Sequence, residues 1–359
     1  MIYKFGELYC GPGGLSLGAG QAKIKNKNGE IFKVSHSWAN DYDEDTCNTY
    51  NLNIGANIAL CRDVRELDIA SMPQIDAFAF GFPCNDFSIV GEQNGIDGEY
   101  GPLYTYGIKT LEIHQPQWFI AENVGGITSA NEGLAFKKIL RDMRNVGDHG
   151  YNIVPHLYKF EEYAVPQKRH RVVIVGIRGD LEVEYKIPAP TTSLNELQST
   201  AKSAIEQPRI DKKAKNNEFT KQHPRVVERL MHLKEGENAW KEGLPDHLKL
   251  NVKGAKLSQI YKRLVADKPA YTVTGSGGGG THVYHWKEPR ALTNRERARL
   301  QTFPDWFEFT GSKESVRKQI GMAVPVLGAQ IIVEAILKSF AGINYKYVDN
   351  NITLSGKRK

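Results

Sequence analysis

Residues 75–88 read Ile-Asp-Ala-Phe-Ala-Phe-Gly-Phe-Pro-Cys-Asn-Asp-Phe-Ser, and this stretch decides the fold. The apolar run over 75–80 predicts a buried strand, and Gly81 and Pro83 end it. Cys84 therefore follows the carboxyl end of a strand, where open α/β sheets bind their ligands. A cysteine there can act as a nucleophile, although a buried structural cysteine is the commoner role of this residue type.

Other chemically active side chains border strands farther along the chain. Glu122-Asn123 follows the apolar segment 118–121, and the sequence Gln-Lys-Arg-His-Arg at 167–171 precedes the apolar segment 172–177. A thiol, a carboxylate and a guanidinium that each border a strand are typical of an active site. Taken singly, the carboxylate could instead cap a turn, and the arginine could pair with a surface acid.

The spacing of apolar residues divides the chain at about residue 178. Before it, strands are expected at 3–9, 33–39, 75–81, 117–121, 152–158 and 171–177, and helices at 13–22, 43–52, 103–115 and 132–147. This alternation predicts a parallel sheet with helices on both faces. The prolines and polar residues of 187–225 predict loops. After Leu292 a helix returns, with Thr293 and Glu296 as a capping box, and 325–340 is a last amphipathic helix.

Composition and charge restrict the kind of protein. The 359 residues are 40% hydrophobic, which is enough for one large core and a smaller appendage. The four cysteines lack a paired metal spacing, and we find no signal peptide and no apolar run that could cross a membrane. We therefore expect a cytoplasmic protein with reduced thiols and no metal. Residues 201–268 hold 16 Lys and Arg against nine Asp and Glu, which suggests a polyanionic partner, although a solvated lysine-rich surface explains the excess equally well.

The first predicted strand runs into a glycine-rich turn. Glu7 and Tyr9 lie at the end of the strand, and Gly11, Gly13 and Gly14 precede a predicted helix, which is the usual entry to a nucleotide site. These glycines do not follow the G-x-G-x-x-G spacing, and the Glu7 carboxylate would repel a pyrophosphate. A cationic amino-acid ligand suits this carboxylate better.

Two more acids follow later strands. Asp41 comes after the strand at 34–39, where it could accept hydrogen bonds from ribose hydroxyls, and Asp63 could accept one from an adenine amine. Three acids at strand ends favour S-adenosylmethionine, which carries an ammonium and a sulfonium, over NAD. A generic dinucleotide fold with incidental acids is an equally good interpretation of these residues alone.

Six motifs in order make the chain resemble the bacterial DNA (cytosine-5)-methyltransferases, over about 1–178 and 270–340. They are the cofactor motif at 7–14, the nucleophile motif at 82–88, Glu122-Asn123-Val124, Gln167-x-Arg169-x-Arg171, the long motif at 290–305 and the last motif at 319–325. Each motif alone is unspecific, whereas six in this order are very specific. Two residues depart from the family: Met322 stands where relatives usually have Asn, and Val90 where some have a small polar residue.

The resemblance implies a doubly wound, Rossmann-like, S-adenosylmethionine-dependent methyltransferase sheet with a small, irregular target-recognition domain. The catalytic domain is expected at 1–178, the target-recognition domain at 179–289, a return to the catalytic domain at 290–345 and a basic tail at 346–359. The implied reaction transfers a methyl group to carbon 5 of a flipped-out cytosine in a specific duplex sequence. It proceeds through a covalent adduct with Cys84 and leaves S-adenosylhomocysteine.

The resemblance also implies roles for individual residues. Cys84 is the nucleophile, Glu122 shares a proton with the base, and Arg169, with Arg171 beside it, holds the base carbonyl and orients Glu122. Cofactor contacts are implied for Tyr9, Gly11, Gly13, Gly14, Asp41, Tyr42, Asp63, Val64, Pro83, Leu103 and Val324. DNA contacts are implied for Ser88, Thr272, Gly277, Gly278 and Arg290, and no metal is implied.

The implied partner is double-stranded DNA, and a cognate restriction endonuclease is a candidate second partner. We expect a monomer that does not associate with membranes. A tRNA methyltransferase, an inactive DNA reader and a Rossmann dehydrogenase each fit part of the sequence. The large basic region 179–289 favours DNA over tRNA, the intact Cys84, Glu122 and Arg169 argue against an inactive reader, and Glu7 argues against a dehydrogenase.

Overall fold

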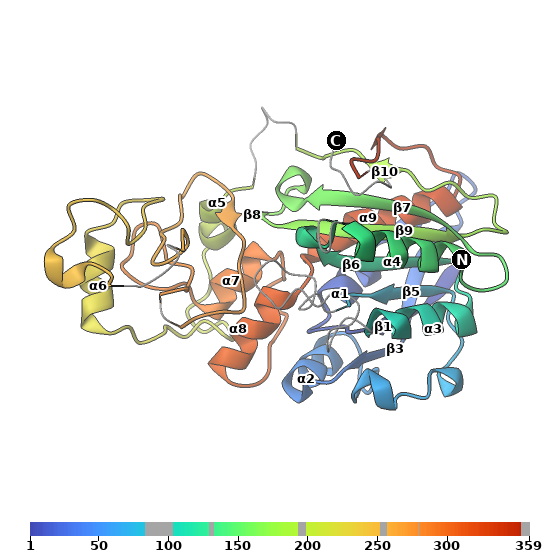
Figure 1. Cartoon of the computed structure of the whole chain (residues 1–359), viewed down its shortest axis with the longest axis horizontal. Helices are drawn as coiled ribbons and strands as arrows, with labels where there is room; N and C mark the ends of the chain where they lie inside the picture. The colour runs from blue at the N-terminus through green and yellow to red at the C-terminus, as the bar shows by residue number, and fades with distance from the viewer. Residues whose placement is uncertain (83–102, 129–132, 193–198, 252–256, 279, 353–359) are drawn as a thin grey trace. The chain divides into compact units, whose positions relative to one another are not determined.

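A computed structural model describes residues 1–359 except 83–102, 129–132, 193–198, 252–256, 279 and 353–359 (Figure 1). Its contacts divide the chain into two compact units. The first unit comprises Met1–Phe160, His170–Pro190 and Val326–Lys359, and the second comprises Glu161–Arg169 and Thr191–Pro325. These bounds differ from the expected ones, because residues 290–325 cluster with the second unit and not with the catalytic sheet.

The first unit is built on one sheet with the strand order β2-β3-β1-β5-β6-β9-β7, and β4 also pairs with β3. The strands are β1 (Ile2–Leu8), β2 (Lys23–Lys25), β3 (Ile31–Asp41), β4 (Ala59–Cys61), β5 (Ala77–Phe80), β6 (Trp118–Val124), β7 (Tyr151–Lys159) and β9 (His170–Arg178). Strands β3, β1, β5 and β6 pair in parallel, which confirms the predicted doubly wound sheet.

Strand β9 corrects the expectation of a parallel sheet. It lies antiparallel between β6 and β7. Only residues 160–169 separate β7 from β9, and a connection this short cannot make the crossover that parallel neighbours need. The hairpin places the start of β9 beside the carboxyl end of β6, where the candidate catalytic residues lie.

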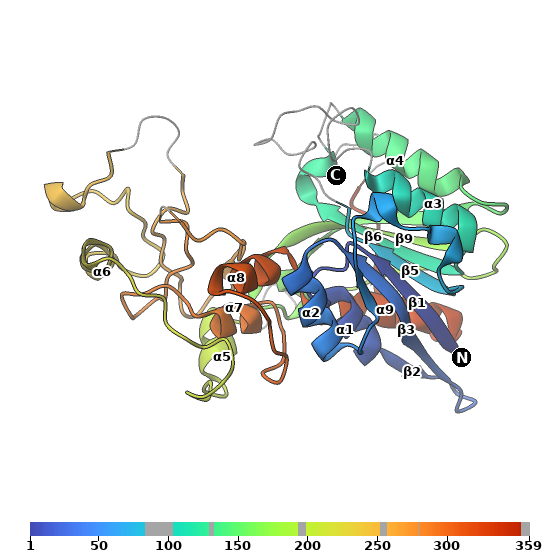
Figure 2. The same ribbon diagram turned by 90° about the horizontal axis from the view of Figure 1, so that it is seen from below.

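The predicted helices of the first unit are confirmed, and they cover both faces of the sheet (Figure 2). They are α1 (Gly14–Gln21), α2 (Glu44–Asn53), α3 (Tyr104–His114), α4 (Leu134–Asn145) and α9 (Val326–Phe340). Helices α1 and α9 pack so closely that a Cβ on Gly18 would lie 2.3 Å from the Val326 carbonyl oxygen. A side chain at Gly18 would therefore force these two helices apart.

The core beside the site is aromatic. All four residues of β5 are buried, and its rings Phe78 and Phe80 stack with centroids 5.2 Å apart. Helix α3 packs on this layer through Gly107, since a Cβ there would lie 2.4 Å from the Phe80 ring. Truncating Phe80 to alanine would cost about 3–5 kcal/mol, because a cavity would remain under the strand that leads to Cys84.

The end of the chain is more ordered than a basic tail. Strand β12 (Tyr347–Val348), within the segment expected to be a basic tail, pairs with β10 (Ile187–Pro188). The Asn351 side chain also accepts a hydrogen bond from the Leu157 backbone N–H at 2.9 Å and donates one to its carbonyl at 3.0 Å. Residues 353–359 lie outside the described part of the chain.

The second unit is rich in loops, as the prolines predicted. Its helices and strands are short: β8 (Gln167–Lys168), α5 (Ala201–Glu206), α6 (Pro224–Met231), β11 (Ala270–Tyr271), α7 (Asn294–Leu300) and α8 (Lys313–Met322). The capping box predicted for α7 is present, with Thr293 and Glu296 bonded reciprocally.

Buried arginines hold the loops of the second unit together. The Arg263 guanidinium donates to four carbonyl oxygens, those of His285, Leu230, Leu233 and Glu288, at 2.8–3.2 Å. Arg295 likewise donates to carbonyls of residues 215, 304 and 307. Irregular backbone leaves carbonyls without ladder partners, and the five donors of a guanidinium satisfy several at once.

One segment corrects the expectation that no stretch could cross a membrane. Lys313–Phe340 is long and apolar enough for a span by length and composition, and 67% of its most apolar window is buried within the structure. Residues 323–325 divide it into α8 and α9. Core helices of soluble proteins pass the same test of length and composition.

Candidate active site

The candidate catalytic residues gather where β5 and β6 end. Phe80 pairs with Ala121, so Gly81 and Glu122 are the next residues of two parallel neighbours. A Cβ on Gly81 would lie 3.5 Å from Glu122 Oε2. Glu122 is part of β6 and does not follow it as expected. Pro83, Cys84 and Ser88, which follow Gly81 in sequence, lie outside the described part of the chain.

Asn123 connects β6 to the chain that leads to Cys84. Its buried side chain donates a hydrogen bond from Nδ2 to the Phe82 carbonyl oxygen at 3.1 Å, and its Oδ1 accepts one from the Val124 N–H at 2.8 Å. The last carbonyl before Pro83 is therefore fixed to the strand that carries Glu122. Sequence reasoning quoted Asn123 in its motif and gave it no role.

Arg171 forms an ion pair with Glu122, with 2.8 Å between Nε and Oε1. Because β9 runs antiparallel to β6, Arg171 lies opposite Val124, which is on the same face of β6 as Glu122. The two side chains are only 13% and 14% exposed. The pair is thus largely shielded from water and fixed by strand register.

Arg169 is engaged differently from the expectation. Its guanidinium, which is 1% exposed, donates to the carbonyls of Val273, Gly321 and Met322 at 3.0–3.3 Å within the second unit. Gln167 binds the same residue, Val273, because its Oε1 accepts a hydrogen bond from the Val273 N–H at 2.8 Å. The orienting contact expected from Arg169 is the one that Arg171 makes.

A buried acid lies at the carboxyl end of β1. Ser16 and Tyr50 form a hydrogen-bonded chain at 2.7 Å, and Ser16 Oγ donates to Glu7 Oε2. Burial, opposed by the hydrogen bond from Ser16 and aided by the negative charge of Asp41, raises the pKa of Glu7 to about 8. No cation is among the groups that set this pKa, so Glu7 is mostly a neutral carboxylic acid at pH 7.

Asp41, the last residue of β3, holds the glycine turn in place. Its Oδ2 accepts from the Gly11 N–H at 3.0 Å, and its Oδ1 accepts from the Asp43 N–H at 3.1 Å. Burial raises the pKa of Asp41, and hydrogen bonds from backbone N–H groups oppose this. The adjacent Tyr42 is 69% exposed.

The glycine turn takes a left-handed backbone. Gly11 and Gly13 have φ values of 55° and 96°, and Gly14 begins α1. Tyr9 also has a positive φ, and its hydroxyl donates to the Leu103 carbonyl at 2.7 Å. This bond ties the end of β1 to the residue before α3.

Two expected cofactor residues have other surroundings. Asp63 caps a short 3-10 helix and forms an ion pair with Arg65 at 2.6 Å. The hydrogen bonds from Arg65 hold the pKa of Asp63 below its usual range. The next residue, Val64, is buried. Val324 belongs to the second unit and is half-buried there. Each therefore needs its own test as a cofactor contact.

Of the residues expected to contact DNA, Ser88 lies outside the described part of the chain, and the second unit holds the others, which are Thr272, Gly277, Gly278 and Arg290. The Thr272 hydroxyl donates to the Lys168 carbonyl at 2.6 Å, and the Gly278 carbonyl accepts from Thr281 Oγ1 at 2.7 Å. Arg290 pairs with both Glu296 oxygens at 2.8 Å and with Glu288 at 2.6 Å. Its charge is thus compensated inside the unit.

Two other arginines contact the glycine-rich segment 275–280, the glycine loop, or the residue before it. Arg297 is 1% exposed and donates to the Thr274 carbonyl, and Arg317 Nε donates to the Gly275 carbonyl. A Cβ on Gly277 would lie 2.1 Å from Arg317 Nε, so a side chain there would make this guanidinium move. Burial, then repulsion by Arg317, lowers the pKa of Arg297 to about 10. In the sequence, only the repeated arginines of 295–299 pointed to a role for Arg297.

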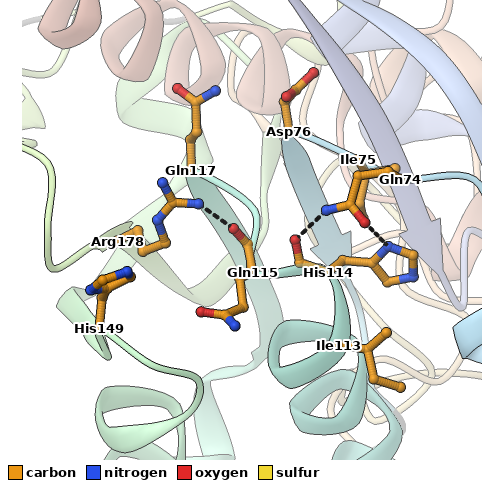
Figure 3. A pocket seen from close by; sticks show the side chains of 9 residues that line it. All are labelled: Gln74, Ile75, Asp76, Ile113, His114, Gln115, Gln117, His149 and Arg178. Carbon is orange, nitrogen blue, oxygen red and sulfur yellow. Dashed lines mark hydrogen bonds between the residues drawn. The ribbon is translucent and has the colours of Figure 1, made fainter.

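A cavity of about 400 Å³ lies at the opposite edge of the sheet (Figure 3). Asp76 and Gln117, which directly precede β5 and β6, line it. Its Arg178 is paired with Asp180 at 2.7 Å and donates to the Gln115 carbonyl at 2.6 Å. Ligands of parallel sheets bind at the carboxyl ends of strands, so this cavity is not the active-site candidate.

Among the residues that the structure describes, no group of three His, Cys, Asp or Glu side chains could hold a metal ion.

The sequence model of the C-5 cytosine-specific DNA methylases matches residues 3–338. The chain belongs to this family. The methylase is 58% identical over 358 residues to the Type II methyltransferase M.BbvI of Brevibacillus brevis, covering 98% of this chain and 95% of that one. It is 39% identical to M.NgoFVII of Neisseria gonorrhoeae, covering 96% and 89%.

Solved structures agree on the fold of the methylase. A putative DNA modification methyltransferase encoded within a prophage of E. coli superposes with a TM-score of 0.70 at 22% identity, over 94% of this chain and 99% of that chain. The S. pombe Dnmt2 methyltransferase superposes with a TM-score of 0.62 at 17% identity, over 96% and 100%. At these identities the likeness concerns the fold alone.

Proposed function

We propose that this DNA (cytosine-5)-methyltransferase modifies one cytosine of a specific duplex sequence through a covalent adduct at Cys84. Glu122 and Arg171 act together on the base. The observation that carries the proposal is the shielded Glu122–Arg171 pair, with 2.8 Å between its atoms, beside Gly81 and the start of the Cys84 segment.

The reaction needs a nucleophile because carbon 5 of cytosine is too electron-poor to accept a methyl cation equivalent unaided. Addition of the Cys84 thiolate at carbon 6 makes the ring an enamine, whose carbon 5 is nucleophilic. After methyl transfer, a base removes the carbon-5 proton and the Cys84 thiolate leaves. None of these steps can occur inside a stacked duplex, so the target base must be flipped out.

Glu122 responds to the charge that this addition creates. A carboxyl group hydrogen-bonded to ring nitrogen 3 and the exocyclic amine shares a proton with the ring as negative charge develops. Arg171 fixes the Glu122 carboxylate at 2.8 Å and presents a guanidinium that can also reach the base carbonyl. We assign Arg169 a positioning role instead, since its donors hold carbonyls of the second unit.

The acids at the ends of β1 and β3 suit S-adenosylmethionine. Burial, and to a lesser extent the charge of Asp41, raises the pKa of Glu7, and a cationic ligand would favour its ionised form. Asp41 would hold the ribose, and the exposed ring of Tyr42 would stack on the adenine. When bound, S-adenosylmethionine supplies an electrophilic methyl group on its sulfonium.

Remaining cofactor contacts would come from the glycine turn, Tyr9, Leu103, Asp63, Val64, Pro83 and Val324. On the DNA side, the glycine loop and Arg317 would lie against the duplex, joined by Ser88, Thr272, Gly277 and Gly278. The basic excess of 201–268 would neutralise phosphates.

The relatives' names point to a biological role. M.BbvI and M.NgoFVII are Type II methyltransferases, and we infer that this protein likewise protects cytoplasmic DNA from a cognate endonuclease as a monomer. Bisulfite sequencing of DNA from cells that express the gene tests reaction and target together. We expect one short sequence to be methylated throughout, and equal methylation of all sequence contexts would contradict a specific target. Methyl incorporation into tRNA but not DNA would contradict the substrate.

A further inference from the structure

Two cysteines meet beside the segment that we assign to the cofactor. Cys47 lies in the first turn of α2, and Cys61 is the last residue of β4. In the parallel pairing of β3 with β4, Cys61 lies opposite Asp41. Residues 14 positions apart in sequence are thus brought to the same end of β3.

The two thiols have neighbouring hydrogen-bond acceptors. Cys47 Sγ donates to the Asp41 carbonyl oxygen at 3.4 Å, and Cys61 Sγ donates to the Tyr42 carbonyl oxygen at 3.6 Å. Burial, then the charge of Asp41 and then the Cys61 thiol raise the pKa of Cys47. Cys47 is buried and Cys61 is exposed, and the carbonyls that accept from them belong to the consecutive residues Asp41 and Tyr42.

We propose that Cys47 and Cys61 form a reversible intramolecular disulfide when the protein meets a peroxide. An exposed thiol with a resolving thiol within reach is the arrangement of reversible cysteine oxidation. The pairing of β3 with β4 and the first turn of α2 bring both cysteines to the end of β3 that carries Asp41.

The chemistry balances with hydrogen peroxide as the oxidant. The Cys61 thiolate attacks one peroxide oxygen, the O–O bond breaks, and hydroxide takes a proton and leaves as water. Cys47 sulfur then attacks the resulting Cys61 sulfenic acid, the S–O bond breaks, and the second water leaves with the Cys47 proton. The two thiols together lose two electrons, and one hydrogen peroxide gains them and becomes two waters. A small dithiol reverses the bond by exchange.

The bond would also affect cofactor binding, a consequence that rests on the proposed function. Both thiol protons are lost, so the carbonyls of Asp41 and Tyr42 lose a donor each. The Asp41 carboxylate holds Gly11 in the glycine turn, so a shift at this strand end moves the turn as well. We expect the dissociation constant for S-adenosylmethionine to rise about fivefold, the size of one lost hydrogen bond.

The test uses full-length protein with Cys84→Ala, which removes the proposed nucleophile as an oxidation target. The protein is treated with hydrogen peroxide, remaining thiols are alkylated, and peptides are analysed by mass spectrometry. We expect a disulfide-linked peptide pair containing Cys47 and Cys61, an alkylated Cys10, and loss of the pair after dithiothreitol. Cys61 recovered as a sulfinic acid in protein that retains Cys47, or both thiols still alkylated, would overturn the proposal.

Matched variants keep the result interpretable. With Cys47→Ser added, Cys61 should oxidise to a form that dithiothreitol does not restore, and with Cys61→Ser added no intramolecular pair should form. A Cys47–Cys61 pair with unchanged S-adenosylmethionine affinity would overturn the effect on the cofactor site. If the reduced protein bound no S-adenosylmethionine, the proposed function would fail, and the mass spectrum would still decide the disulfide.

Discussion

Replacing Arg171 by glutamine should slow methyl transfer far more than it weakens the fold. The change removes the partner that lies 2.8 Å from Glu122 Oε1, in a pair whose members are 13% and 14% exposed. Glutamine retains hydrogen-bonding capacity and loses the positive charge.

The magnitude follows from the shielding of this pair. Removing one preorganised donor from a water-poor site costs about 10²–10³-fold in kcat, or roughly 3–4 kcal/mol of transition-state stabilisation. Water still reaches the pair, so we expect a loss near 10²-fold, the lower end of this range. The assay is single-turnover methyl transfer with S-adenosylmethionine and target duplex both saturating.

Two other arginines serve as matched controls. Arg178 forms an ion pair with Asp180 at the opposite edge of the same sheet, so Arg178→Gln should leave kcat unchanged. Arg169→Gln should act through the fold, because it leaves buried carbonyls of the second unit short of donors, and should cost about 2–4 kcal/mol of unfolding free energy.

The reverse pattern would refute this reasoning. If Arg171→Gln kept kcat within about threefold of wild type, while Arg169→Gln abolished transfer without lowering Tm, Arg169 would be the catalytic arginine. The ion pair at Glu122 would then be structural only.

Further predictions concern the nucleophile, the cofactor and DNA. Cys84→Ser should abolish transfer and leave S-adenosylmethionine affinity near normal, and turnover above about a hundredth of wild type would exclude the covalent route. Asp41→Ala should weaken S-adenosylmethionine binding by roughly 1–3 kcal/mol in calorimetry, since it loses a ribose contact and frees Gly11; unchanged affinity would assign the ribose to another acid. Folding raises the pKa of Glu7 from 4.5 to about 8. Protonated Glu7 therefore contributes fully to the free energy of unfolding at low pH, and this contribution is lost as the pH rises from 4.5 through 8. Glu7→Gln should therefore raise the Tm of the ligand-free protein at pH 8 while weakening S-adenosylmethionine binding, and a lower Tm at pH 8 would contradict the buried acid. Replacing the three lysines of 212–215 by glutamine should flatten the log–log salt dependence of DNA affinity by about one unit for each phosphate that is no longer neutralised, and an unchanged slope would leave these lysines as a solvated surface.

Much of the first unit could be predicted from sequence because its signals are local. The apolar runs that predicted β1, β5, β6 and β7 are buried strands of one sheet, and the glycines after β1 start α1 as expected. The order of the motifs was sufficient to name the family, which the comparison with known proteins confirms.

The choice between Arg169 and Arg171 could not be made from sequence. The two lie two positions apart in one motif, and which of them faces Glu122 depends on the antiparallel register of β9 against β6. That register follows from the short connection after β7, whereas the alternating pattern favoured a parallel sheet.

The second unit was the least predictable part of the chain. Its loops are held by buried arginines such as Arg263, and sequence alone does not distinguish these from surface arginines that could bind phosphate. Arg290 shows the same difficulty: it was expected on DNA, and its charge is compensated by Glu288 and Glu296. The thiols of Cys47 and Cys61 meet through a strand, β4, that the apolar pattern did not predict.

Covalent trapping tests the central claim most directly. A duplex with 5-fluorocytosine at the site found by bisulfite sequencing is incubated with the enzyme and S-adenosylmethionine, because fluorine at carbon 5 prevents the final proton removal. We predict a stable protein–DNA adduct that peptide mass spectrometry places on Cys84 and that Cys84→Ala does not form. Methyl transfer to normal duplex without any adduct at Cys84 would contradict the account.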